Sequence, residues 1–249
     1  MKPYLPDLLH ALLEKPQDSV FLLDFDGTMV DFATNPDDVH VPDELIEDIR
    51  KLAAKKDLAF AIVTGRPLSK LDYFMKGVTT VAIGSHGAEW RPVAAAPSEK
   101  LADPMPEEIR KAITAVGERH QCIVEDKFFT LSLHLPFDDA EKDLMPELIA
   151  AAGTDDYSIR RTGRTYEVLQ KSVTKGTGIR HLMEQPGFAG RQPVYIGDDV
   201  HIDAELNVVE EMRGLMFGVA HTSPHAAPNP RAVMSVRDVC RMIALLAEG

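Results

Sequence analysis

The chain has 249 residues, 45% of them hydrophobic, and a formal net charge of −12. This length and apolar content suffice for one large domain or two modest ones with a real core. The acidic balance and the lack of a basic block argue against a nucleic-acid groove, while Cys122 and Cys240, far apart in the sequence, are expected to be free thiols of a reducing compartment.

The N-terminal segment, residues 1–19, places Leu8, Leu9, Leu12 and Leu13 at helical spacing. The segment is too polar for a signal peptide, and the sequence contains no run of 18 apolar residues that could cross a membrane. We therefore expect a cytoplasmic protein that binds neither membrane nor nucleic acid, as a monomer or a small homo-oligomer.

Short apolar runs alternate with longer amphipathic segments over the first 90 residues. The apolar runs are typical of buried strands and cover residues 20–23, 58–63 and 79–84. The segments between them have the spacing of helices and cover residues 43–56 and 67–75. Apolar strands separated by helices predict a parallel α/β sheet. Ligands of such sheets bind beyond the carboxyl ends of the strands, where Asp24, Thr64 and Ser85 stand.

A different pattern occupies residues 91–170. Residues 91–106 are rich in proline and alanine, as is typical of a linker. The following segments alternate between predicted helices (107–120 and 138–152) and predicted strands (121–126, 128–135, 157–161 and 165–170). Leu131, Leu133 and Leu135 put one apolar face on a strand whose other face is polar. We therefore predict a small α+β domain, inserted into the parallel sheet.

The first pattern resumes from Lys175. The predicted elements are a helix, a strand, a helix, a strand and a closing helix, over residues 176–185, 193–197, 203–212, 214–219 and 236–247. Residues 221–230 contain too much proline for either kind of element. The sequence thus predicts a core domain of residues 1–90 and 171–249, interrupted by an inserted domain of residues 91–170.

Polar motifs follow the predicted core strands. Residues 24–28 read DFDGT, residues 64–66 read TGR, and residues 197–199 read GDD, with Lys175 standing alone before the last motif. A polar turn explains each motif singly, but buried carboxylates are unfavourable by several kcal/mol unless paired, protonated or bound to metal. In this order the motifs resemble those of haloacid-dehalogenase-type phosphatases over nearly the whole chain. The resemblance implies a Rossmann-like parallel-sheet core with an inserted α+β cap domain of the C2 type.

This resemblance implies roles for the core carboxylates. Asp24 would attack phosphorus and form an aspartyl-phosphate, and Asp26 would act first as general acid and then as general base. Mg²⁺ would be bound by Asp24, by the backbone carbonyl of Asp26 and by Asp198, while Asp199 would orient its neighbours. Lys175 would pair with both the nucleophile and the phosphate.

The TGR motif would bind the phosphate group of the substrate. Thr64 matches a phosphate-binding hydroxyl, and Gly65 and Arg66 follow it in the same loop. For Arg66 the sequence leaves two interpretations open, a contact with phosphate or one with an acidic neighbour.

Three segments narrow the resemblance to trehalose-6-phosphate phosphatases, enzymes of trehalose biosynthesis. These segments are SHGAE, VEDKFFTLSLHL and YEVLQKSVTKG, at residues 85–89, 124–135 and 166–176. The resemblance implies that Glu125, Lys127 and Glu167 bind sugar hydroxyls. The alternative is a cross-strand ion pair on a solvated sheet.

One motif departs from the family pattern. Residues 197–205 read GDDVHIDAE, with His201 and Ile202 where these phosphatases have Thr and Asp, and with Asp203 at the position of a Glu. The change could reshape metal binding, and Asp203 could compensate for it.

Other functions therefore stay open. The substrate could be another sugar phosphate, such as mannosyl-phosphoglycerate, sucrose phosphate or glucosylglycerol phosphate, or the chain could be a non-catalytic sugar-phosphate sensor. A signalling receiver domain also combines carboxylates, a threonine and a lysine. The chain is about twice too long for one, and Asp26 adds an acid/base group that receivers lack.

Overall fold

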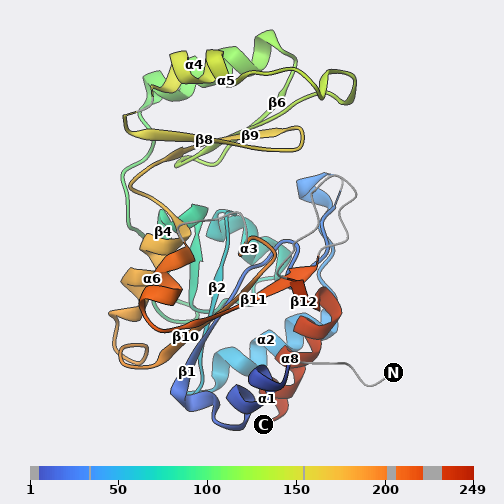
Figure 1. Cartoon of the computed structure of the whole chain (residues 1–249), viewed down its shortest axis with the longest axis vertical. Coiled ribbons are helices and arrows are strands. Elements are labelled where there is room, and N and C mark those ends of the chain that lie inside the picture. Colours follow the sequence, from blue (N-terminus) through green and yellow to red (C-terminus); the bar gives the residue numbers. More distant parts are fainter. Residues whose placement is uncertain (1–5, 34, 154, 201–205, 221–231) are drawn as a thin grey trace. The chain divides into compact units, whose positions relative to one another are not determined.

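The computed structural model describes residues 6–33, 35–153, 155–200, 206–220 and 232–249 (Figure 1). The chain forms two compact units. The core unit comprises residues 1–99 and 175–249, and the inserted unit comprises residues 100–174. Each unit has its own sheet and its own buried apolar cluster.

The core unit is built on an eight-stranded sheet of order β12-β11-β10-β1-β2-β3-β4-β5. Its strands are β1 (Ser19–Leu23), β2 (Ala59–Val63), β3 (Ala82–Gly84), β4 (Glu89–Arg91), β5 (Glu99–Lys100), β10 (Gln192–Gly197), β11 (Leu215–Ala220) and β12 (Ala232–Ser235). Every pairing from β12 to β3 is parallel, whereas β4 runs antiparallel to β3. The predicted parallel α/β core is therefore confirmed.

Helices cover this sheet because its central strands are apolar on both faces. All five residues of β1 and all five of β2 are buried. The helices of the core unit are α1 (Asp7–Glu14), α2 (Asp43–Ala54), α3 (Leu68–Phe74), α6 (Lys175–Met183), α7 (Asn207–Glu211) and α8 (Val236–Glu248). Helices α2 and α8 pack against each other, and their apolar residues join Phe21 and Leu23 in one cluster (Figure 1).

Local sequence signals explain where several of these helices begin. Helix α8 starts with a capping box, in which the Ser235 side chain accepts from the backbone N–H of Asp238 and the Asp238 carboxylate accepts from the backbone N–H of Ser235. Helix α2 follows Pro42 and carries Asp43 and Glu44 in its first turn, where the helix dipole favours negative charge.

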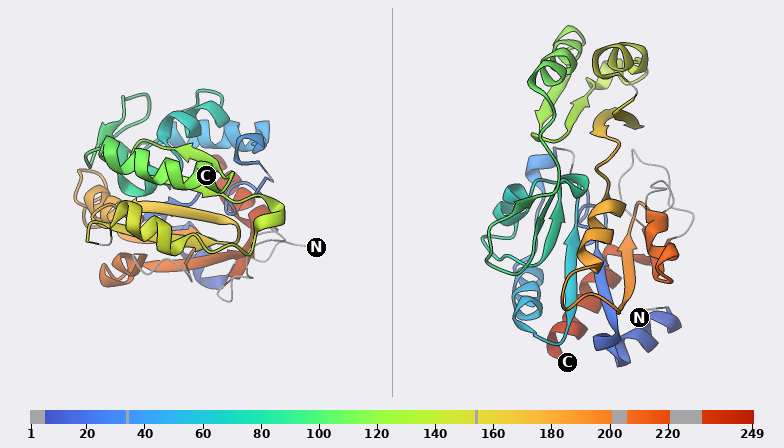
Figure 2. Two further views of the ribbon diagram at one scale, coloured as in Figure 1. Left: turned by 90° about the horizontal axis from the view of Figure 1, so that it is seen from above. Right: turned by 90° about the vertical axis from the view of Figure 1, so that its left-hand side faces the viewer.

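The inserted unit has a four-stranded antiparallel sheet of order β6-β7-β9-β8. Its elements are α4 (Glu107–Arg119), β6 (Ile123–Asp126), β7 (Leu131–His134), α5 (Met145–Ala152), β8 (Tyr157–Thr162) and β9 (Thr165–Gln170). Helices α4 and α5 lie on one face of the sheet (Figure 2), where Leu131, Leu133 and Leu135 are buried as the alternation predicts. The other face is left for polar side chains.

Short 3-10 helices connect several elements, at Pro16–Asp18, Pro36–Asp38, Ser85–Gly87 and Phe137–Asp139. Among the described residues, no helix combines the length and the apolar character needed to cross a membrane.

The structure corrects several sequence predictions. The predicted linker at 91–106 is wrong in its first part, because β4 and β5 extend the core sheet and the core unit runs to Glu99 rather than to residue 90. The predicted helix over 138–152 begins only at Met145, after a 3-10 turn. Strands β4, β5 and β12 were not predicted, since two to four residues are too few to show a periodicity. The predicted loop at 221–230 lies outside the described residues.

Candidate active site

The predicted core motifs meet at one edge of the parallel sheet. Asp24 follows β1, Thr64 follows β2 and Asp198 follows β10, and these three strands are neighbours in the order β10-β1-β2. Because carboxyl ends of adjacent parallel strands lie at the same edge, residues far apart in the sequence come together there.

Asp24 is buried in this edge and held on both carboxylate oxygens. Its Oδ1 accepts from the backbone N–H of Phe25 at 2.7 Å, and its Oδ2 lies 2.9 Å from Lys175 Nζ. Only 5% of Asp24 and 6% of Lys175 are exposed. Lys175 is the first residue of α6, so the helix start fixes the base of its side chain. The predicted pairing of Lys175 with Asp24 is therefore present.

Asp199 occupies the other side of the Lys175 ammonium. Its Oδ2 lies 2.7 Å from Lys175 Nζ, and its Oδ1 accepts from the hydroxyl of Tyr195 at 2.9 Å. Both Asp199 oxygens thus already accept hydrogen bonds from this chain.

The turn after Asp24 brings the DFDGT and GDD motifs together. Gly27 has φ +73°, and a β-carbon there would lie 2.5 Å from Phe32 Cε2 and 2.8 Å from Asp198 Cγ. Thr28 is buried, and its hydroxyl accepts from the backbone N–H of Asp198 at 3.0 Å. Glycine is needed here both for its backbone conformation and for the close approach of the two loops.

Asp26 forms a bidentate ion pair with Arg66. Arg66 Nε lies 2.7 Å from Asp26 Oδ2, and Arg66 Nη2 lies 2.8 Å from Asp26 Oδ1. The guanidinium carbon of Arg66 lies 4.7 Å from the ring centre of Phe74, so the ring makes a cation–π contact with the guanidinium group. Of the two interpretations of Arg66, the contact with an acidic neighbour is present.

Thr64 and Gly65 form a tight, buried loop. The Thr64 side chain is fully buried, and its hydroxyl accepts from the backbone N–H of Arg66 at 3.1 Å. A β-carbon on Gly65 would lie 2.5 Å from the His86 ring, so this glycine makes room for the ring. Ser85 and His86 have φ of 47° and 56°, and the backbone N–H of His86 donates to the Thr64 carbonyl at 3.2 Å. Hydrogen bonds between the two loops stabilise this strained backbone.

The predicted sugar-binding residues lie together within the inserted unit. Lys127 Nζ is 3.6 Å from Glu125 Oε2 and 3.4 Å from Glu167 Oε1. The Ser132 hydroxyl donates to Glu167 Oε1 at 3.2 Å, and His134 Nε2 lies 3.7 Å from Glu125 Oε2. The ion pairs of the alternative interpretation, a cross-strand pair on a solvated sheet, are therefore present. The same side chains also provide hydrogen-bond donors and acceptors of the kind that sugar hydroxyls need.

Comparison with known proteins decides the family. A family model described as trehalose-phosphatase matches residues 22–232. The chain belongs to the trehalose-phosphatase family. The resemblance predicted from the motifs is therefore confirmed, and membership in this family makes the chain a phosphoric monoester hydrolase.

Individual trehalose-phosphatases match over most of their length. The chain is 29% identical over 247 residues to a probable trehalose-phosphate phosphatase of Sinorhizobium fredii, covering 96% of this chain and 93% of that protein. It is 26% identical over 227 residues to trehalose-6-phosphate phosphatase of Escherichia coli, covering 88% and 85%. The C-terminal domain of C. albicans trehalose-6-phosphate phosphatase has the same fold, with a TM-score of 0.78, 20% identity and coverage of 100% and 99%.

The trehalose-phosphatase site carries surplus negative charge. Burial first, and then the neighbouring carboxylates, raise the pKa of Asp24 well above its usual range, against the opposing effect of Lys175. Burial and Asp199 raise the pKa of Asp198 to about 7. Burial alone would lower the pKa of Lys175, but Asp199 and Asp24 outweigh it and raise this pKa, so the ammonium stays charged.

This charge suits a divalent cation. One carboxylate oxygen from each of Asp24, Asp198 and Asp199 can be chosen so that all lie within 4.8 Å of one another. These three carboxylates lie close together with one ammonium, which contacts Asp24 and Asp199, and oxygen ligands are what hard cations prefer. The donor set therefore fits a metal ion. Asp203, the other acidic residue considered from the sequence, lies outside the described residues.

Sequence reasoning missed Tyr195. Its side chain is fully buried in β10, and burial, followed by the nearby carboxylates, raises the pKa of its hydroxyl well above the usual range. The sequence did contain a signal for it. Tyr195 lies two residues before Gly197, so the two residues share a face of the strand that leads to the GDD carboxylates. A buried tyrosine hydroxyl in an apolar strand usually has a polar partner.

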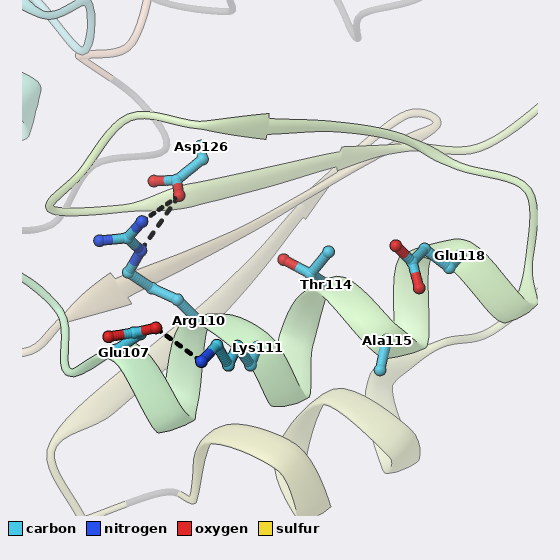
Figure 3. A pocket seen from close by; sticks show the side chains of 7 residues that line it. All are labelled: Glu107, Arg110, Lys111, Thr114, Ala115, Glu118 and Asp126. Atoms are coloured by element: carbon cyan, nitrogen blue, oxygen red, sulfur yellow. Dashed lines mark hydrogen bonds and ion pairs between the residues drawn. The ribbon is translucent and has the colours of Figure 1, made fainter.

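A hollow on the inserted unit contains none of the predicted site residues. It is lined by Glu107, Arg110, Lys111, Thr114, Ala115 and Glu118 of α4 and by Asp126 of β6 (Figure 3). Arg110 pairs with Asp126 at 2.7 Å and Lys111 pairs with Glu107 at 2.6 Å. Its lining contains none of the residues of the DFDGT, TGR and GDD motifs, so it is not the candidate site.

Proposed function

We propose that this chain is a Mg²⁺-dependent phosphatase that hydrolyses trehalose 6-phosphate to trehalose and phosphate. The observation that carries the proposal is the buried placement of Lys175 between Asp24 and Asp199, with Asp198 beside them. The S. fredii relative is named for trehalose phosphate and the E. coli relative for trehalose 6-phosphate, which supports this substrate.

Asp24 is the nucleophile in this proposal. One of its carboxylate oxygens attacks phosphorus, the bond from phosphorus to the sugar oxygen breaks, and an aspartyl-phosphate forms. Lys175 supports this step because its ammonium already lies against Asp24 and would also attract the phosphate oxygens. Thr64 and Gly65 would contact the same oxygens from the end of β2.

Asp26 is the acid and base. It gives a proton to the departing sugar oxygen, then takes one from the water that hydrolyses the aspartyl-phosphate, which regenerates Asp24 and releases phosphate. The bidentate contact with Arg66 supports the base step of this role, because it holds Asp26 as a carboxylate two residues from the nucleophile. Arg66 is then a contact of the acid as well as a candidate contact of the substrate.

Asp24, Asp198 and the backbone carbonyl of Asp26 would hold Mg²⁺. The ion would screen the repulsion between the Asp24 carboxylate and the phosphate dianion. Asp199 is suited to orient Lys175, because its carboxylate joins the Lys175 ammonium to the Tyr195 hydroxyl.

The inserted unit would act as the cap that recognises the sugar. Glu125, Lys127 and Glu167 would bind sugar hydroxyls, and their grouping within 3.6 Å of the Lys127 ammonium supports a shared contact. The free thiols of Cys122 and Cys240 support a reducing compartment such as the cytoplasm.

A panel of phosphate esters, with and without Mg²⁺, tests the proposal. Phosphate release would be measured for trehalose 6-phosphate, sucrose phosphate, mannosyl-phosphoglycerate and glucosylglycerol phosphate. Trehalose 6-phosphate should have the highest kcat/KM, and chelation of the metal should abolish turnover. A higher kcat/KM for another ester would show that this ester, and not trehalose 6-phosphate, is the substrate. Tight binding of a sugar phosphate without phosphate release at high Mg²⁺ would indicate a sensor.

A further inference from the structure

Tyr195 contacts two residues of the candidate site without reaching the nucleophile. Its hydroxyl donates to Asp199 Oδ1 at 2.9 Å and accepts from Lys175 Nζ at 3.4 Å. We propose that Tyr195 is a positioning residue for phosphoryl transfer, which acts through Asp199 to hold the Lys175 ammonium against Asp24. The inference rests on the proposed role of Asp24 as the nucleophile, and it adds Tyr195, which has no part in the mechanism described above.

The hydrogen bonds form a closed triangle. Lys175 Nζ lies 2.7 Å from Asp199 Oδ2, so the tyrosine hydroxyl, the carboxylate and the ammonium each contact the other two. A lysine ammonium on a four-carbon stem has no fixed direction of its own. A carboxylate bound through only one oxygen can still rotate, whereas Tyr195 fixes the second oxygen of Asp199. The triangle therefore defines where the ammonium lies.

The ammonium also contacts the nucleophile. Lys175 Nζ lies 2.9 Å from Asp24 Oδ2, and both of these side chains are nearly excluded from solvent. Effects of position on charge stabilisation are largest where water cannot compensate for a misplaced group. A shift of the ammonium away from Asp24 should therefore appear in the rate of phosphoryl transfer.

Gly197 gives independent support, because its small size keeps the triangle intact. A β-carbon at this position would lie 2.6 Å from Tyr195 Cε1 and 2.7 Å from Asp199 Oδ1. The backbone of Gly197 is not in the left-handed region, so any residue could adopt its conformation. A larger side chain at this position would therefore push Tyr195 and Asp199 apart.

Tyr166 provides a matched control. Like Tyr195 it is fully buried, and its hydroxyl accepts from the backbone N–H of Leu144 at 3.1 Å and donates to the carbonyl of Lys142 at 3.2 Å. It lies in the apolar cluster of the inserted unit. Tyr166→Phe removes the same atom from a similar environment without touching Lys175 or Asp199.

The experiment compares Tyr195→Phe, Tyr166→Phe and the unchanged chain, all with Mg²⁺ present. Both variants should lower the Tm slightly, because each loses a buried hydrogen bond. Only Tyr195→Phe should lower kcat, by about tenfold, with KM within about twofold. The loss should be equal for trehalose 6-phosphate and for p-nitrophenyl phosphate, since Lys175 and Asp24 serve every ester. Gly197→Ala should reproduce it.

A metal-free crystal structure of Tyr195→Phe gives a second measurement, in which Asp199 or the Lys175 ammonium should have moved from its present place. The proposal is overturned if kcat falls no further than in Tyr166→Phe, or if added Mg²⁺ restores kcat, because Tyr195 would then act on the metal instead. Failure of the unchanged chain to hydrolyse trehalose 6-phosphate would refute the proposed substrate alone, because the ratio measured with p-nitrophenyl phosphate does not depend on the sugar.

Discussion

Replacing Asp198 by asparagine should stabilise the metal-free protein while removing its response to Mg²⁺. The carboxylate lies beside Asp24 and Asp199, and burial and Asp199 raise its pKa to about 7 from the ordinary value of 3.8. An asparagine has nearly the same shape and no charge. The site therefore loses one repelling carboxylate and one metal ligand in the same substitution.

The magnitude follows from the pKa. Because the pKa of Asp198 is higher in the folded chain, the folded state binds the proton more tightly, and this contribution to stability is complete below pH 3.8 and lost as the pH rises through about 7. At 1.36 kcal/mol per pKa unit, a shift of about three units corresponds to up to about 4 kcal/mol of lost stability at about pH 8. For a chain of this size, each kcal/mol changes the Tm by about 2–4 °C.

Thermal unfolding followed by circular dichroism measures this effect. With a chelator at about pH 8, Asp198→Asn should unfold several degrees above the unchanged chain. The difference should fall to less than about half of this at about pH 5 and disappear below about pH 4, where Asp198 is protonated in both the folded and the unfolded chain. Mg²⁺ should raise the Tm of the unchanged chain and not that of the variant. Asp57→Asn, at an exposed position between α2 and β2, is the control for a lost surface charge.

The reasoning is refuted if metal-free Asp198→Asn is less stable than the unchanged chain at about pH 8. Such a result would mean that the carboxylates of this site do not destabilise one another.

Three further substitutions test the assigned roles. Asp24→Asn should abolish phosphate release without lowering the Tm, and activity near that of the unchanged chain would remove Asp24 as the nucleophile. Arg66→Lys keeps the charge and loses the two-pronged contact with Asp26, so kcat should fall about tenfold at an unchanged Tm; steady-state kinetics that show a change in KM alone would assign Arg66 to substrate binding instead. Glu125→Ala should raise KM for trehalose 6-phosphate at least about tenfold and leave p-nitrophenyl phosphate unaffected, with Glu147→Ala as the control on the same unit; equal losses on both esters would count against a sugar contact.

The sequence by itself determined the fold class and the family. Apolar runs on both faces of the strands are compatible only with a sheet covered on both sides, which is why the parallel core and the order of its main elements could be predicted. The DFDGT, TGR and GDD motifs follow the strands because the ends of parallel strands are where such folds bind ligands. These signals are local in the sequence, so they do not depend on knowing the tertiary structure.

Only the tertiary structure decided which side chains meet. Nothing in the sequence near Arg66 states that its guanidinium pairs with Asp26, 40 residues away, or that Tyr195 completes the contacts of Lys175 and Asp199. The short strands β4, β5 and β12 are recognised only by their pairing with neighbouring strands, because each is too short for its own sequence to identify it. Pairing across long stretches of chain depends on the register and packing of the whole sheet, and a pattern of a few residues cannot encode it.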